Sequence, residues 1–112
     1  MNSILTSIKK LLGIEEEYEH FDQDITMHIN SVFMILNQLG VGPSGGFVIA
    51  DETAEWTDFI SDIVKVEAVK TYVYLKVKLL FDPPLSSAVM ESIKQQITEL
   101  EWRLNVAAET NS

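Results

Sequence analysis

Residues 69–84 read VKTYVYLKVKLLFDPP, and the fold depends on whether they form a strand or a helix. From Val69 to Leu79 every second residue is apolar or β-branched, an alternation that is typical of a strand. The segment upstream, residues 56–67, instead follows helical spacing, and no turn signal separates the two parts. Their uninterrupted length favours one long helix over residues 56–81. A helix that is apolar almost all round is expected at the centre of a bundle.

The double proline at 83–84 ends this helix, because the residue before a proline avoids the helical backbone conformation. A last helix is predicted over residues 86–108, capped by one of its first serines, with a frayed tail over 109–112. Trp102 falls on the polar side of this helix, where an exposed tryptophan marks an interface or covers an edge of its own domain. The expected core residues of the last helix are Val89, Ile93, Ile97, Leu100 and Leu104.

Two further helices are predicted upstream, over residues 3–12 and 22–39. Ser3 is the expected cap of the first helix, and either Asp22 or Asp24 is the expected cap of the second. A glycine follows each helix as its natural end. The core-facing residues of these helices are then Ile4, Leu5, Ile8, Leu11, Leu12, Ile25, Ile29, Val32, Phe33, Leu36 and Leu39.

Residues 40–55 form a glycine-rich loop between the second and third helices. Phe47 in this loop either tucks beneath the domain or pairs with a neighbour. Met27 and Met34 lie on the side of the second helix that faces away from its core residues. A second apolar patch is typical of a helix that packs against two partners, although two ordinary, partly exposed methionines are the alternative. Trp102, Met27, Met34 and Phe47 are therefore the candidate interface residues.

Charge is distributed unevenly along the chain. Seventeen acidic and eight basic residues give a net charge of −9. Residues 15–64 contain eleven acidic residues and neither lysine nor arginine, whereas residues 65–112 contain six of each sign. A protein that grips nucleic acid needs a basic surface to neutralise phosphates. We therefore do not expect DNA as a bound ligand, although an acidic surface is suited to repel it.

Length and composition limit the protein class. A single domain over residues 1–112 is expected, and 46% hydrophobic residues are enough for a core. The absence of cysteine excludes disulfides, thiolate catalysis and the commonest structural zinc sites. No apolar run reaches the length of a membrane span, and the first residues do not form a secretory signal.

Two patterns are typical of ligand sites, but both lack the context that their chemistry requires. Residues 40–45 match the dinucleotide pattern GxGxxG, yet a predicted helix precedes them where that motif needs a strand. A second pattern is the spacing of four residues between His20, Asp24 and His28. This spacing aligns three metal ligands only on one continuous helix, and His20 falls before the predicted helix. We therefore expect no catalytic residues, no metal, no cofactor and no enzymatic activity.

Three segments resemble a known family. They are YVYLKVKLLFDPP at 72–84, ELEWRL at 99–104, and IKKLLGI at 8–14 with the acidic linker that follows it. These segments are similar to phage head–tail connector (adaptor) proteins, small proteins of tailed bacteriophages and prophages. The resemblance implies an all-α fold, a small bundle of about four helices, and it favours the helical interpretation of residues 56–81.

The resemblance also implies a structural role at the head–tail junction of the virion, reached after assembly in the host cytoplasm. Copies of the chain would form a dodecameric ring that binds the portal protein above and a stopper or tail-completion protein below. DNA would pass through without specific binding, and no membrane would be involved. Two alternatives stay open: an acidic binding module such as a DNA-mimicking inhibitor of a host nucleic-acid enzyme, and a small metal-dependent enzyme built on His20, Asp24 and His28.

Overall fold

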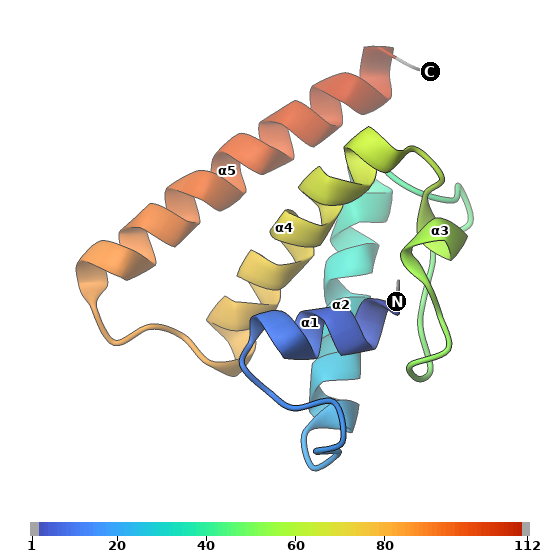
Figure 1. The fold of residues 1–112 in the computed structure, drawn as a ribbon. Helices are drawn as coiled ribbons and strands as arrows, with labels where there is room; N and C mark the ends of the chain where they lie inside the picture. Colours follow the sequence, from blue (N-terminus) through green and yellow to red (C-terminus); the bar gives the residue numbers. More distant parts are fainter. Residues whose placement is uncertain (1–2, 111–112) are drawn as a thin grey trace.

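The computed structural model describes residues 3–110 as helices and connecting segments (Figure 1). In chain order the elements are α1 (Ile4–Leu11), α2 (Asp22–Gln38), α3 (Trp56–Phe59), α4 (Ile63–Phe81) and α5 (Ser87–Thr110). The described residues form no strand beyond an isolated bridge between Ser3 and Glu55. The predicted all-α bundle is therefore confirmed, with four helices of two turns or more and the short helix α3.

The helix predicted over residues 56–81 is in fact two helices, α3 and α4, separated by an extended segment. Ile60 has the extended backbone angles φ −152° and ψ 133°. The Asp62 carboxylate accepts hydrogen bonds from the backbone N–H groups of Val64 (3.0 Å) and Lys65 (3.3 Å), so it caps α4. Aspartate offers the backbone this local alternative to a continuous helix, which the spacing of the apolar residues did not reveal.

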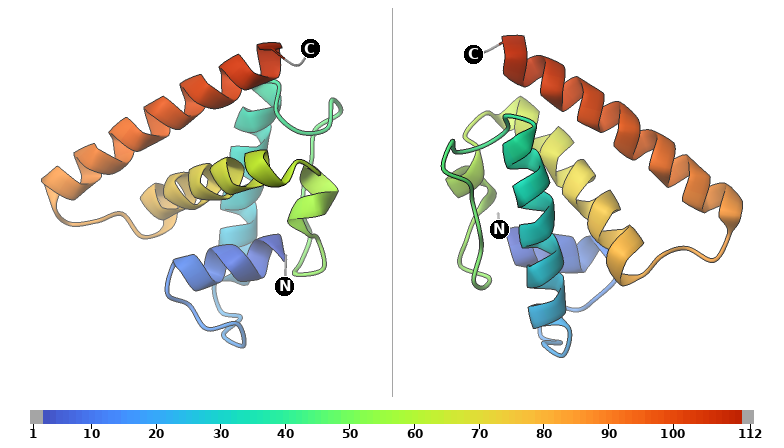
Figure 2. Two further views of the ribbon diagram at one scale, coloured as in Figure 1. Left: turned by 45° about the horizontal axis from the view of Figure 1, so that its top comes forward. Right: turned by 180° about the vertical axis from the view of Figure 1, so that it is seen from behind.

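The helix α4 lies at the centre of the structure and packs against α1, α2 and α5 (Figures 1 and 2). Because it has neighbours on several sides, apolar residues are buried on more than one of its faces. The alternation over residues 69–79 is therefore compatible with a helix. The buried residues of this segment are Val69, Tyr72, Val73, Leu75 and Val77.

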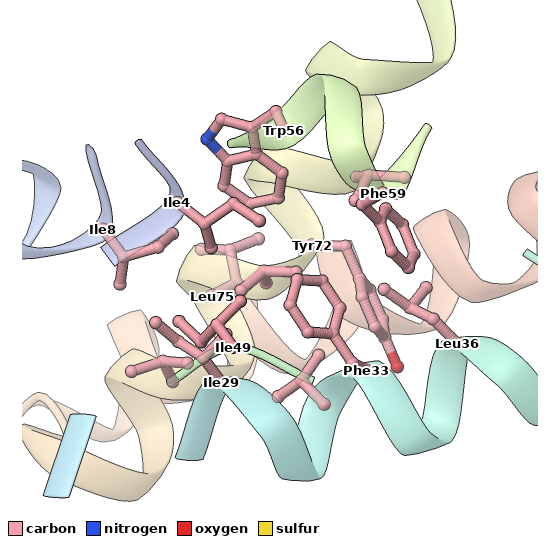
Figure 3. Packing of buried hydrophobic residues seen from close by; sticks show 14 of the residues in the cluster. Ile4, Ile8, Ile29, Phe33, Leu36, Ile49, Trp56, Phe59, Tyr72 and Leu75 are labelled. Atoms are coloured by element: carbon pink, nitrogen blue, oxygen red, sulfur yellow. The ribbon is translucent and has the colours of Figure 1, made fainter. Parts of the chain in front are cut away.

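Aromatic side chains from α2 and α3 fill the centre of the core (Figure 3). The rings of Phe33 in α2 and Phe59 in α3 stack with their centroids 4.6 Å apart. Trp56 is 2% exposed, and its Nε1 donates a hydrogen bond to Ser7 Oγ in α1 at 2.8 Å. Although α3 has a single turn, it thus contributes two aromatic side chains to the core and is fixed to α1.

A buried lysine connects α1, the acidic linker that follows it, and α2. Lys9 is 2% exposed, and its Nζ lies 2.8 Å from Asp22 Oδ1 at the start of α2. The same ammonium group donates to the backbone oxygens of Glu16 at 2.9 Å and Tyr18 at 2.8 Å. Two backbone oxygens accept from this ammonium group and the Asp22 carboxylate pairs with its charge, and partners of this kind are the condition for burying a lysine without a large penalty.

The helix ends follow most of the predicted signals. Ser3 Oγ accepts from a backbone N–H of the first turn and caps α1. Gly40 has a φ of +84°, and the two backbone hydrogen bonds of a Schellman motif close the end of α2 there. The cap predicted for α2 is wrong, because Asp22 and Asp24 lie within its first turn and Phe21 occupies the cap position. Both carboxylates still suit the positive end of the helix dipole.

The helix α5 makes its hydrogen bonds to the rest of the bundle in its C-terminal half. The Tyr72 hydroxyl in α4 donates to Glu101 Oε2 at 2.6 Å, and the Asn105 side chain donates to Leu39 O after α2 at 3.3 Å. Burial raises the pKa of Tyr72, and the Glu101 carboxylate raises it further, because both disfavour the phenolate. This hydrogen bond therefore links the two longest helices.

Several boundary and core predictions need correction. The helix α5 continues to Thr110, so the tail predicted over residues 109–112 is helical as far as it is described, and residues 111–112 lie outside the described range. Val89, predicted as a core residue, is 47% exposed, because the first turn of α5 lies apart from α4 (Figures 1 and 2). Leu11, also predicted as a core residue, is 49% exposed at the end of α1.

Replacement of Gly42 by alanine is expected to destabilise the fold. Gly42 has a φ of +89°, and an added Cβ would overlap the ring of Phe59. The left-handed conformation and the steric overlap together predict a loss of roughly 2–4 kcal/mol in the free energy of unfolding. Gly45→Ala is the matched control, because nothing lies within 4 Å of its added Cβ. Urea denaturation of both variants tests this expectation, and equal stability would contradict it.

Replacement of Lys9 by methionine is expected to lower stability by about 3 kcal/mol, because it leaves a partly buried carboxylate and two backbone oxygens without their donor. Lys10→Met is the control, since Lys10 neighbours Lys9 in sequence but is exposed. Thermal denaturation followed by circular dichroism compares the two variants. If Lys10→Met destabilises the protein as much as Lys9→Met does, the connecting role of Lys9 is wrong.

The raised pKa of Tyr72 predicts a loss of stability in alkali. A tyrosine in the unfolded chain ionises near its ordinary pKa of 10.0, whereas folded Tyr72 keeps its proton to higher pH. The contribution of Tyr72 to the free energy of unfolding is therefore fully present below pH 10. It is lost as the pH rises from that value towards the pKa of Tyr72 in the folded protein. Tyr72→Phe should cost about 1.5 kcal/mol at neutral pH and should flatten the alkaline decline. If the stability of the wild-type protein and that of Tyr72→Phe decline equally as the pH rises, this role of Tyr72 is wrong.

Candidate interaction surfaces

The first candidate surface is a groove of about 750 Å³ between α2 and the glycine-rich loop. Met27 and Met34 lie on its α2 side and are 59% and 62% exposed. Phe47 and Val48 lie on its loop side, so the structure brings together three of the four candidate interface residues. We call this surface the methionine groove; its lining residues are Gln23, Thr26, Met27, Asn30, Ser31, Met34, Asn37, Gly45, Gly46, Phe47 and Val48.

The loop side of the methionine groove is fixed to the core. Phe47 is half-buried, and its ring lies 5.4 Å from the rings of both Phe33 and Phe59. The Asn30 side chain accepts from Ile49 N at 2.8 Å and donates to Ile49 O at 2.9 Å, as a neighbouring strand would. Phe47 therefore tucks against the core as well as lining the groove, and the groove is preformed.

The second candidate surface surrounds Trp102 on the outer side of α5. Trp102 is 66% exposed and does not line the methionine groove. An ion pair lies beside it in the sequence, with Arg103 Nη2 2.8 Å from Glu99 Oε1. The tryptophan therefore covers little of its own domain and stands among polar side chains: Glu91, Lys94, Gln95, Thr98 and Glu99.

A third apolar surface, which the sequence analysis did not identify, lies at the connection between α4 and α5. Leu85 is fully exposed, and Leu80 and Val89 are 54% and 47% exposed. We call these three residues the apolar corner. The double proline prevents either helix from continuing through the connection, so Leu85 has no helix face through which to be buried. A leucine placed directly after two prolines was the signal available in the sequence.

Carboxylates gather on the surface formed by the linker before α2 and the loop before α3. The linker contributes Glu16, Glu17 and Glu19, and the loop contributes Asp51 and Glu52. Hydrogen bonds from Thr53 lower the pKa of Asp51, so this carboxylate stays ionised. These five residues form the acidic surface. In Figure 1 its linker part lies at the bottom of the molecule, away from α5.

The residues considered for metal or nucleotide binding do not form a site. His20 lies in the turn before α2, where its ring packs 4.8 Å from that of Phe21, so the spacing with Asp24 and His28 is not that of one helix. Among residues 3–110, no three histidine, aspartate or glutamate side chains are grouped to hold a metal ion. The GxGxxG segment follows α2, and α3 begins only at Trp56.

The described residues thus define an all-α protein whose main features are surfaces suited to contact with other proteins. None of the helices in this range has both the length and the apolar character that a membrane crossing requires. A family model described as phage connector protein matches residues 4–111, so the chain belongs to the phage connector protein family. This confirms the family predicted from the sequence and gives the chain a structural role as a virion component. No curated protein and no solved structure is significantly similar to the chain.

Proposed function

We propose that residues 1–112 form a single head–tail connector domain whose copies assemble into a ring beneath the phage portal protein. The ring binds the portal on one side and a stopper or tail-completion protein on the other, and DNA passes through its centre. The subunit acts as a contact element at the head–tail junction and catalyses no reaction. Family membership supports the connector role, and the arrangement of exposed surfaces supports the ring.

The observation that carries this proposal is the number of separate apolar surfaces on so small a protein. A subunit of a ring needs two different surfaces for its neighbours and further surfaces for the proteins above and below. The methionine groove lies between α2 and the glycine-rich loop, the apolar corner flanks the α4–α5 connection, and the Trp102 surface lies on the outer side of α5. Exposed apolar patches of this kind typically mark sites of protein–protein contact.

The acidic surface suits the wall or the rim of a DNA passage. Carboxylates repel phosphates, so DNA slides past such a surface without binding, whereas lysine and arginine would hold it. The same charge makes free copies repel one another, and this repulsion weakens when salt screens it. Contacts with the portal would offset the repulsion, so the portal would template the ring during assembly.

The alternative of a DNA-mimicking inhibitor is less well supported by the placement of the carboxylates. A mimic needs free carboxylates in rows along an exposed face. Here Asp22 pairs with Lys9, and Asp51 accepts hydrogen bonds from Thr53. Asp62 caps α4 in the same local manner. Since several acidic residues have structural partners within this fold, the connector interpretation explains more of them.

Trp102→Ala is expected to weaken binding to the portal protein while leaving the fold intact. Removal of an exposed tryptophan at an interface typically costs about 2 kcal/mol, which corresponds to a roughly 30-fold weaker affinity. Cosedimentation with purified portal measures the binding, and circular dichroism measures the helical content.

Val64→Ala is the matched control, since Val64 is an 82% exposed apolar residue on α4. The interface role of Trp102 is wrong if Trp102→Ala binds the portal as well as Val64→Ala does, or if Trp102→Ala unfolds the monomer.

A further inference from the structure

The apolar corner is an exposed feature that the fold leaves without a partner. Leu85 lies between two elements that cannot bury it, because the prolines before it end α4 and α5 begins only at Ser87. The neighbouring Leu80 and Val89 are also about half exposed. Three exposed aliphatic side chains in and beside one connection are costly in water unless another surface covers them.

The methionine groove is a receptor of suitable size and chemistry for such a feature. Its volume of about 750 Å³ exceeds that of a leucine side chain, so it has room for several residues of a partner. Methionine side chains are flexible and polarizable, which allows them to adapt to an inserted aliphatic group. The Asn30–Ile49 hydrogen bonds hold the loop side in place, so insertion needs no rearrangement of the loop.

Charge indicates which partner these two surfaces accept. Residues 25–50, which provide most of the groove, contain no Asp, Glu, Lys or Arg, and neither do residues 83–90 around Leu85. The whole chain carries −9, so two copies repel each other wherever their charged surfaces meet. A cationic partner would select the acidic surface, whereas a second copy, which carries the same net charge, meets the least repulsion where uncharged residues face each other. The groove has no charged residue in its lining, and Leu85 and Val89 of the corner lie in the uncharged run 83–90 that follows Asp82.

The positions of the two surfaces decide the symmetry of such a contact. In Figures 1 and 2 the α4–α5 connection lies at one edge of the molecule, and the glycine-rich loop lies at the opposite edge. Different surfaces on opposite edges make a heterologous contact, which each added copy repeats and which closes into a ring when the rotation allows it. The end of the acidic linker adjoins the end of α4, where the rings of Phe21 and Phe81 lie 5.1 Å apart.

We propose that the apolar corner of one copy inserts Leu85 into the methionine groove of the next copy, and that this contact joins the subunits of the ring. The inference rests on the proposed connector function and specifies its self-association site. It also gives Met27, Met34 and Phe47 one partner and leaves the Trp102 surface for the portal.

Disulfide trapping tests the contact directly, because the native chain has no cysteine. Leu85→Cys and Met34→Cys are prepared separately, mixed, and oxidised with oxidised glutathione. A disulfide requires Cα atoms within about 7 Å, so only surfaces that meet will be joined. We expect the mixed dimer of Leu85→Cys with Met34→Cys to form at least about tenfold faster than that of Leu85→Cys with Val64→Cys, a control position that is even more exposed than Met34.

Three results would overturn the proposal. The first is equal trapping rates for the Met34→Cys and Val64→Cys partners. The second is a predominance of Leu85→Cys homodimers, because this indicates a symmetric contact between two corners. The third is an unchanged rate when Met27→Glu is added to the Met34→Cys chain, since a carboxylate in the groove should exclude Leu85.

The portal assay separates this proposal from the proposed function. If trapping fails while the portal still binds the wild-type chain, the connector role stands and the subunit contact is wrong. If trapping succeeds and the portal does not bind, the corner–groove contact stands and the connector role is wrong.

Discussion

The central constraint on this fold is that α4 buries residues on more than one of its faces and must be covered on several sides. The helices α1 and α2 cover it on one side and α5 covers it on another. The core forms at the meeting point of α4 with α2 and α3, where Tyr72 is fully buried among aromatic and aliphatic residues. Placing α4 in the middle fixes which faces of the other helices are buried. It also fixes which faces are left for partners.

One buried lysine determines the charge at the edge of the bundle where the acidic linker lies. The Lys9 ammonium group holds the linker by its backbone oxygens and pairs with Asp22. With this lysine buried, the linker presents its glutamates outward without a basic residue among them. The same residue that joins α1 to α2 thereby leaves the acidic surface uncompensated. The connection between α1 and α2 and the proposed repulsion of DNA therefore both depend on the Lys9 side chain.

The exposed apolar surfaces arise from the same architecture. The helix α2 uses one face for the core and leaves Met27 and Met34 on the other. The double proline separates α4 from α5 and leaves Leu85 without cover. A stable monomer would gain from covering these side chains, whereas a member of a connector family has neighbours that can do so.

The sequence by itself determined the features that depend on only a few neighbouring residues. The cap at Ser3, the glycine end at Gly40 and the stop at the double proline are local backbone constraints. The position of Met27 on the face of α2 away from the core, and the uneven charge along the chain, could likewise be predicted from the sequence. These features predicted most helix ends and the candidate interface residues, whereas the family and the helical interpretation of residues 56–81 were predicted from the resemblance of residues 8–14, 72–84 and 99–104.

Only the tertiary structure decided the features that depend on distant neighbours. The alternation over residues 69–79 fits either a strand or a surrounded helix, and the packing of α1, α2 and α5 around it selects the helix. The break at Ile60 accommodates two aromatic side chains in a core to which α2 also contributes, and spacing within one helix cannot show this. The pairing of Lys9 with Asp22 and the exposure of Leu85 depend likewise on where separate elements come to lie. A periodic pattern specifies which face of a helix is apolar, but only packing specifies whether another element covers that face.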